Sequence, residues 1–224
     1  MANGKSKIKS LPIYTKGEEI ANTISHGLGV ILGITATILC LIVAIRQDNS
    51  YAFASGLIYG ISLIFLYTMS SVYHGLNPKR KAKKTFQILD HCAIFLLIAG
   101  SYAPLLLCCL REYSTKLCWV IWSVVWIMAI IGIIFTAIDL HKYKVFSMIC
   151  YLVMGWCIIF KINLLPQLMG VKGFALLLSG GISYTLGAVF YGLGKKHRYA
   201  HFVFHIFVLI GSVLQFLCIY VYVI

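Results

Sequence analysis

The sequence has few charged residues, and acidic residues are the scarcest of all. Only 11% of its 224 residues are charged, and Asp and Glu together number 6. Ordinary soluble domains carry about 25% charged residues, so this composition excludes one. The apolar fraction is 61% and the mean hydropathy is +0.92. We therefore expect an all-α integral membrane protein.

The sequence also lacks any C-x-x-C pair. Its eight cysteines lie within or at the ends of apolar stretches, and Cys108 and Cys109 are adjacent. Cysteines in this setting are typical of small hydrophobic side chains. We therefore expect neither disulfides nor zinc thiolates from them.

Seven apolar stretches reach the length of about 20 residues that a membrane-spanning helix needs. The gaps between them are short and polar, so the whole chain, 1–224, is predicted to be a single seven-helix membrane domain. A polar leader precedes the first stretch. No small-residue cleavage site follows this stretch, so we expect it to be retained as a membrane helix. The predicted spans are 22–45, 51–75, 86–109, 117–138, 146–165, 171–193 and 200–223.

Basic residues gather in alternating gaps. The leader and the second, fourth and sixth gaps carry four, five, two and three Lys or Arg residues, whereas the opposite gaps carry four in all. Cytoplasmic loops collect Lys and Arg, so we expect a cytoplasmic N-terminus and an outer C-terminus. The basic side comprises Lys5, Lys7, Lys9, Lys16, Lys79, Arg80, Lys81, Lys83, Lys84, Lys142, Lys144, Lys195, Lys196 and Arg198.

The net charge of +13 raises the question of a nucleic-acid partner. The basic residues flank predicted spans on one face, where they meet anionic lipid headgroups. The expected partners are therefore membrane lipids and not nucleic acid.

Four ionisable residues are predicted to lie at the same depth of the membrane. His74 falls in the last turn of the second span, Asp90 within the first two turns of the third, and His201 and His205 in the first two turns of the seventh. At a rise of about 1.5 Å per residue, all four fall in an inner slab about 10 Å thick. Intramembrane ionisable residues are costly and tend to mark functional sites.

The spacing within these spans places the side chains in pairs. His201 and His205, like Ser70 and His74, are four residues apart and share a helix face. Three imidazoles with one open position are typical of a catalytic zinc site, in which the metal lowers the pKa of a water molecule. Asp90 is the only carboxylate well inside a span, which argues against Mg²⁺, Ca²⁺ or di-iron.

Other interpretations of these residues stay open. An H-x-x-x-H pair alone is compatible with helix packing, and opposed histidines could hold haem. A proton relay through Asp90 is also physically reasonable.

Several further residues fall near the predicted site. Glu19, Asn22 and His26 share one face at the start of the first helix, as an interfacial polar cluster or as outer partners of the site. His91 points about 100° away from Asp90 on an ideal helix, so we do not expect both to face the site.

Two packing features are also predicted. Gly100 and Pro104 predict a kink in the third helix. A stripe of small residues predicts close packing of the first helix, namely Ser25, Gly29, Gly33 and Thr37.

These motifs together resemble the hemolysin III family, the bacterial type within the progestin and adipoQ receptor superfamily. The resemblance rests on four segments, EEIANTISHGLG at 18–29, SSVYHGL at 70–76, LDHCAIFLLIAGSYAP at 89–104 and HRYAHFVFH at 197–205. It covers nearly the whole chain and, more distantly, extends to alkaline ceramidases.

The resemblance implies a multi-pass protein of the cell membrane, of bacterial type. It implies zinc held by His74, His201 and His205 near the cytoplasmic face, with Asp90 and Ser70 close to the metal's water. Members of adiponectin-receptor type are linked to ceramidase activity, whereas bacterial members are named for haemolysis and associated with membrane lipid homeostasis.

The function predicted from these residues is zinc-dependent hydrolysis of a lipid amide. In this hypothesis Asp90 acts as the general base, and Ser70 positions the water or the developing oxyanion. Asp90 could instead only orient water or a ligand. The competing functions are a pore-forming cytolysin and a receptor or sensor with structural zinc.

Overall fold

The structure is a computed structural model that describes residues 14–193 and 197–224. Within these ranges it is helical without strands, and seven of its helical segments are long and apolar enough to span a membrane. The predicted all-α, seven-span fold is thus confirmed. Lys5, Lys7, Lys9, Lys195 and Lys196, which contribute to the predicted orientation, lie outside the described residues.

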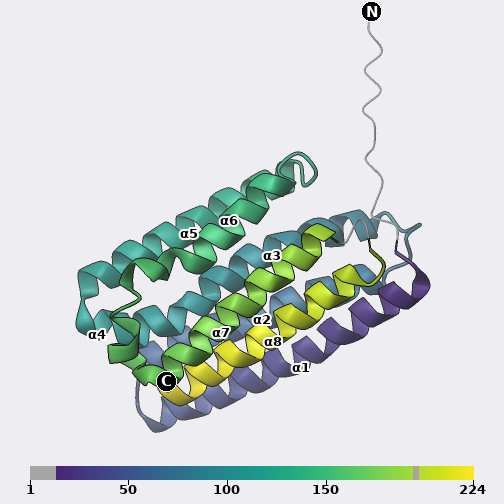
Figure 1. The fold of residues 1–224 in the computed structure, drawn as a ribbon. Helices are drawn as coiled ribbons and strands as arrows, with labels where there is room; N and C mark the ends of the chain where they lie inside the picture. The colour runs from purple at the N-terminus through teal and green to yellow at the C-terminus, as the bar shows by residue number, and fades with distance from the viewer. Residues whose placement is uncertain (1–13, 194–196) are drawn as a thin grey trace, which may run out of the picture.

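The helices follow one another along the chain as a bundle (Figure 1). The elements are α1 (Lys16–Arg46), α2 (Ser50–Gly75), α3 (Ala82–Pro104), a π-helical segment (Leu105–Leu110), α4 (Arg111–Tyr113), α5 (Thr115–Ile138), α6 (Lys144–Trp156), a 3₁₀ segment (Cys157–Lys161), α7 (Leu165–Leu193) and α8 (Ala200–Tyr222). Figure 1 shows α1, α2 and α8 side by side, with α5 and α6 on the far side of α3 and α7. One apolar core surrounds Tyr67 in the first group, and a second surrounds Phe95 on α3.

The first helix begins six residues before its predicted start at residue 22, at Lys16. Thr15 caps it: the Thr15 hydroxyl accepts a hydrogen bond from the Glu18 N–H at 3.3 Å, and the Glu18 carboxylate accepts one from the Thr15 N–H at 2.8 Å. This capping box satisfies helix N–H groups that otherwise have no partner. The hydropathy of the segment gave no sign of this start, because its first residues are polar. Glu18 and Glu19 therefore lie on the first turn of α1.

The third span is interrupted where Pro104 predicts a kink. The α-helical pattern ends at Pro104 and continues as the π-helical segment before α4. Proline has no N–H to donate to the preceding turn, and wider π turns accommodate such a break.

The helix α7 is also interrupted, at Gly170. Gly170 has a φ of 72°, which interrupts α7 after its first turn, so the long part of the helix begins at residue 171 as predicted. Residues 165–169, which the sequence assigned to the end of a span and a gap, form that first turn.

The outer face of α1 is lined with isoleucine. Ile20, Ile24, Ile31 and Ile45 are each at least 59% exposed. Such a face suits contact with lipid chains. The opposite, small-residue face packs on α2, as predicted: a Cβ atom added at Gly29 would overlap the Tyr67 ring, and one at Gly60 would overlap Thr37.

We predict that Gly29→Ala destabilises the protein by about 1–3 kcal/mol, because the added methyl group must displace the Tyr67 ring. Tyr67 also donates a hydrogen bond to Ser212 on α8 at 2.7 Å, so its displacement disturbs three helices. Gly192→Ala is the matched control, since a Cβ at Gly192 would meet no other described side chain or helix within 4 Å. Thermal unfolding in detergent measures both variants. Equal unfolding temperatures for the two would contradict the close packing of α1 on α2.

Candidate metal centre

Three histidines meet at the end of the bundle where α1 begins. His74 comes from the last turn of α2, and His201 and His205 come from the first two turns of α8. Nε2 of His201 lies 3.2 Å from Nε2 of His74 and 3.1 Å from Nε2 of His205. The three residues are 2%, 7% and 1% exposed, respectively. Among the residues that the structure describes, they are the only group of three or more His, Cys, Asp or Glu with ligand atoms this close.

The second ring nitrogens of two histidines assign their protons. Nδ1 of His74 lies 2.7 Å from Oε2 of Glu19, a carboxylate that only accepts, so Nδ1 carries the proton. The Ser25 hydroxyl donates to the Asn22 carbonyl at 3.0 Å and therefore accepts from Nδ1 of His205 at 3.3 Å. In both residues Nε2 is left with a lone pair directed at the other histidines.

Neutral histidines alone cannot satisfy this arrangement. A proton on Nε2 of His201 can point to only one of the two facing lone pairs, which leaves the other pair of nitrogens in repulsive contact. Buried polar atoms without partners are costly. One cation shared by all three nitrogens removes the repulsion, so His74, His201 and His205 could hold a metal ion.

Aromatic residues cover the three imidazoles. The Tyr14 ring stacks on His201 at a centroid distance of 5.1 Å and meets the edge of His74 at 5.6 Å. Tyr14 precedes α1, and burial, together with the nearby Tyr191 and Asp90, raises the pKa of its phenol, which is therefore uncharged at neutral pH. Tyr191 approaches His201 on α8 at 5.8 Å.

His26 lies next to the group without belonging to it. Its ring stacks on His205 with centroids 3.6 Å apart and planes 10° from parallel. Neither of its nitrogens has a hydrogen-bond partner within the described part of the chain, although the residue is only 3% exposed. His26 thus presents unsatisfied polar atoms beside the three histidines.

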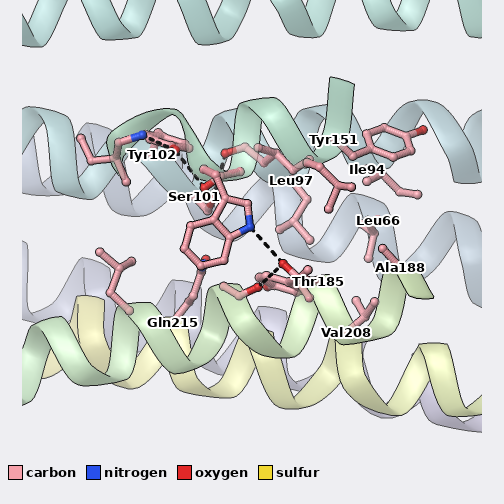
Figure 2. A pocket seen from close by; sticks show the side chains of 18 of the residues that line it. Leu66, Ile94, Leu97, Ser101, Tyr102, Tyr151, Thr185, Ala188, Val208 and Gln215 are labelled. Atoms are coloured by element: carbon pink, nitrogen blue, oxygen red, sulfur yellow. Dashed lines mark hydrogen bonds between the residues drawn. The ribbon is translucent and has the colours of Figure 1, made fainter. Parts of the chain in front are cut away.

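A cavity of about 180 Å³ begins at this polar end and continues into the bundle. His201 and Gln215 both line it, so it follows α8 for about 21 Å. Most of its wall is apolar, with side chains chiefly from α3, α6 and α7; Figure 2 labels Leu97 on α3, Ala188 on α7 and Val208 on α8 among the lining residues. A dashed line in Figure 2 reaches Thr185, which accepts a hydrogen bond from Trp156 Nε1 at 3.0 Å and so links α6 to α7 across the wall.

Ser70 and Asp90 line the polar end of the same cavity, together with His26 and His201. Ser70 is 1% exposed, and its hydroxyl finds no partner among the described side chains and backbone. Ligand pockets commonly combine apolar walls with a few convergent polar groups. The arrangement can bind a long apolar molecule with one polar end beside the three histidines.

His91 also lines this cavity, contrary to the expectation that it and Asp90 would face different ways. Its Nδ1 lies 2.8 Å from the Gln87 carbonyl and 3.8 Å from Asp90, and its Nε2 lies 3.0 Å from the Tyr191 hydroxyl. The 100° separation of successive residues holds for the Cα–Cβ directions. The cavity is wide enough to meet both side chains.

Comparison with known proteins agrees with the motifs. A model of the family described as "Haemolysin-III related" matches residues 14–216, which include all the helices carrying the site. The chain belongs to the haemolysin III-related family. The family resemblance predicted from the four segments is thereby confirmed, and the chain is a multi-pass membrane protein.

Relatives of this haemolysin III-related chain cover nearly its full length. It is 43% identical to "Hemolysin-3" of Bacillus cereus over 92% of both chains. It is 38% identical to "Hemolysin-3 homolog" of Bacillus subtilis (strain 168), over 94% of this chain and 96% of the relative. The human "Monocyte to macrophage differentiation factor" is 29% identical over 99% of this chain and 88% of the relative.

The sequence reasoning missed three residues of the centre. Tyr14 was counted with the leader, Lys83 with a basic loop, and Ser25 with a packing stripe. Ser25 and Asn22 are three residues apart on the face that carries Glu19, and this spacing was the available signal. Tyr14 and Lys83 gave no such signal, because the folding of separate helix ends brings them to the site.

We predict that His74→Ala, His201→Ala and His205→Ala each lose the bound metal. Removing one of three ligands lowers affinity by more than the roughly 10- to 100-fold that loss of an outer partner costs. His26→Phe is the control, because it keeps a ring on His205 and has no nitrogen. Elemental analysis of the purified variants measures the outcome. Metal lost from His26→Phe as readily as from His205→Ala would contradict this ligand set.

Proposed function

We propose that this haemolysin III-related protein is a zinc-dependent hydrolase of a lipid amide that acts in membrane lipid homeostasis. The observation that carries the proposal is the junction of three converging imidazoles with a long apolar cavity. A lipid amide has the matching shape, with an apolar chain for the cavity and an amide for its polar end. Membrane lipids are then the partners of the protein.

The donor set favours zinc over other metals. Two nitrogens bound at about 2.0–2.1 Å in a tetrahedral arrangement lie about 3.3 Å apart, close to the 3.2 and 3.1 Å between the Nε2 atoms. Imidazoles without thiolates or several carboxylates suit zinc better than Mg²⁺ or Ca²⁺. His74, His201 and His205 would hold the ion, which when bound polarises a carbonyl and acidifies water.

The chain's own residues would carry the proton transfers. Asp90 would take a proton from the attacking water as the water oxygen adds to the amide carbon, and would return that proton to the nitrogen as the C–N bond breaks, leaving a carboxylic acid and an amine. Ser70 has a free hydroxyl at the same end of the cavity and would orient the water or the developing oxyanion. The apolar wall would exclude other water from the reacting amide.

We also propose that the site lies near the cytoplasmic face. Among the described residues, the segment between α2 and α3 carries Lys79, Arg80 and Lys81 at the end of the bundle that holds His74. Basic loops of this kind favour the cytoplasmic side.

Asp90→Asn is expected to keep the metal and to lose turnover of a fluorescent N-acylsphingosine by about 10²- to 10⁴-fold, the usual contribution of a general base. Asp48→Asn is the matched control, because Asp48 lies exposed in the turn between α1 and α2. Elemental analysis and product formation in detergent micelles are the two measurements. Retained metal with unchanged turnover would remove Asp90 from the chemistry, and no turnover by the unaltered protein would contradict the proposed activity.

The name of the Bacillus cereus relative suggests a second candidate, a cytolysin. The isoleucine-lined face of α1 argues against it, since such a surface favours a protein that stays in the bilayer. Liposomes containing the protein and an entrapped dye separate the two functions. Lipid cleavage without leakage supports the hydrolase, whereas leakage that survives His201→Ala supports the pore.

A further inference from the structure

Lys83 is a buried lysine at the start of α3. It is 1% exposed, and its ammonium donates to Oε1 of Glu19 at 2.7 Å and to the Leu76 carbonyl at 2.8 Å. The ammonium also lies 5.1 Å from the centre of the Tyr73 ring. A buried charge strongly destabilises the folded protein unless it is paired. The sequence pattern predicted that Lys83 faces lipid headgroups from a loop. This prediction is wrong, because Lys83 is buried on the first turn of α3.

Glu19 connects this lysine to the metal centre. Its two carboxylate oxygens are used on different sides: Oε1 accepts from Lys83, and Oε2 accepts from Nδ1 of His74 at 2.7 Å. A ligand histidine whose other nitrogen donates to a carboxylate is fixed in tautomer and ring orientation. The chain of contacts runs from Lys83 through Glu19 to His74, across the ends of α3, α1 and α2.

Glu19 needs Lys83 to stay in place. The Glu19 side chain is 17% exposed, so water is within its reach. Without Lys83, rotation of the carboxylate toward solvent would separate it from Nδ1 of His74. The other ligand with a defined outer partner, His205, has only the Ser25 hydroxyl at 3.3 Å, a longer and uncharged contact. His74 thus has the shorter and more strongly polar outer hydrogen bond of the two, and Lys83 stabilises its acceptor, Glu19.

We propose that Glu19 and Lys83 are positioning residues of the metal centre, through which a lysine that contacts no ligand controls metal affinity. This inference rests on the proposed metal binding. It adds that the ion pair acts on the metal through the orientation of His74, and does more than hold three helix ends together.

Cobalt(II) titration of the purified full-length protein tests the inference, with visible absorption reporting the geometry of the bound ion. Glu19→Gln is expected to weaken cobalt affinity by about 10- to 100-fold, as for loss of other outer partners. Lys83→Met is expected to weaken it in the same direction and to alter the cobalt spectrum. The double variant should bind no more weakly than Glu19→Gln alone, because both residues act along one chain of contacts. Lys84→Met, at an exposed neighbouring lysine, is the control and should match the unaltered protein.

Thermal unfolding without metal separates positioning from simple stabilisation. Glu19→Gln leaves a buried ammonium without its carboxylate, whereas the double variant removes both charges and should recover stability. The inference requires that metal affinity stays low in the double variant despite this recovery. Affinity that recovers along with stability, or stays within twofold of the unaltered protein in both single variants, would overturn it. If the unaltered protein binds neither cobalt nor zinc, the inference and the proposed function both fail. If it binds metal and the variants bind metal equally well, only the inference fails.

Discussion

Nε2 of His74 and Nε2 of His205 lie only 3.2 and 3.1 Å from Nε2 of His201, and this crowding governs how the surrounding helix ends are arranged. The carboxylate of Glu19 and the hydroxyl of Ser25 direct two lone pairs into the space that the third nitrogen also faces. In a buried environment this geometry is repulsive until a cation occupies the common point. The helix ends hold the three histidines around this common point.

Hydrogen bonds between different helices join the helix ends around the three histidines. Glu18 caps its own helix and also accepts a hydrogen bond from the Tyr199 N–H at 2.9 Å, directly before α8. Lys83 ties the start of α3 to the carbonyl at the end of α2. The membrane-buried part of the bundle combines apolar packing and small residues with a few interhelical hydrogen bonds, such as that from Tyr67 to Ser212. The site lies at this polar end of the bundle, and the cavity extends from it into the apolar part.

Much of the fold and part of the site could be predicted from the sequence, for identifiable reasons. The spans follow from apolar length, and His74, His201 and His205 follow from helical spacing combined with depth. The start of α1 could not, because a capping box in a polar segment carries no hydropathy signal. Lys83 could not, because its burial depends on where three separate helix ends meet. His91 was misjudged because the direction of a Cα–Cβ bond does not determine which side chains reach a wide cavity.

The proposed function depends on one zinc ion bound between the three imidazoles. X-ray absorption at the zinc edge, on protein purified without chelators, tests it most directly. We expect stoichiometric zinc with three imidazole nitrogens at about 2.0–2.1 Å and one further light ligand. A metal-free protein, or a zinc ion surrounded by sulfur, would contradict it.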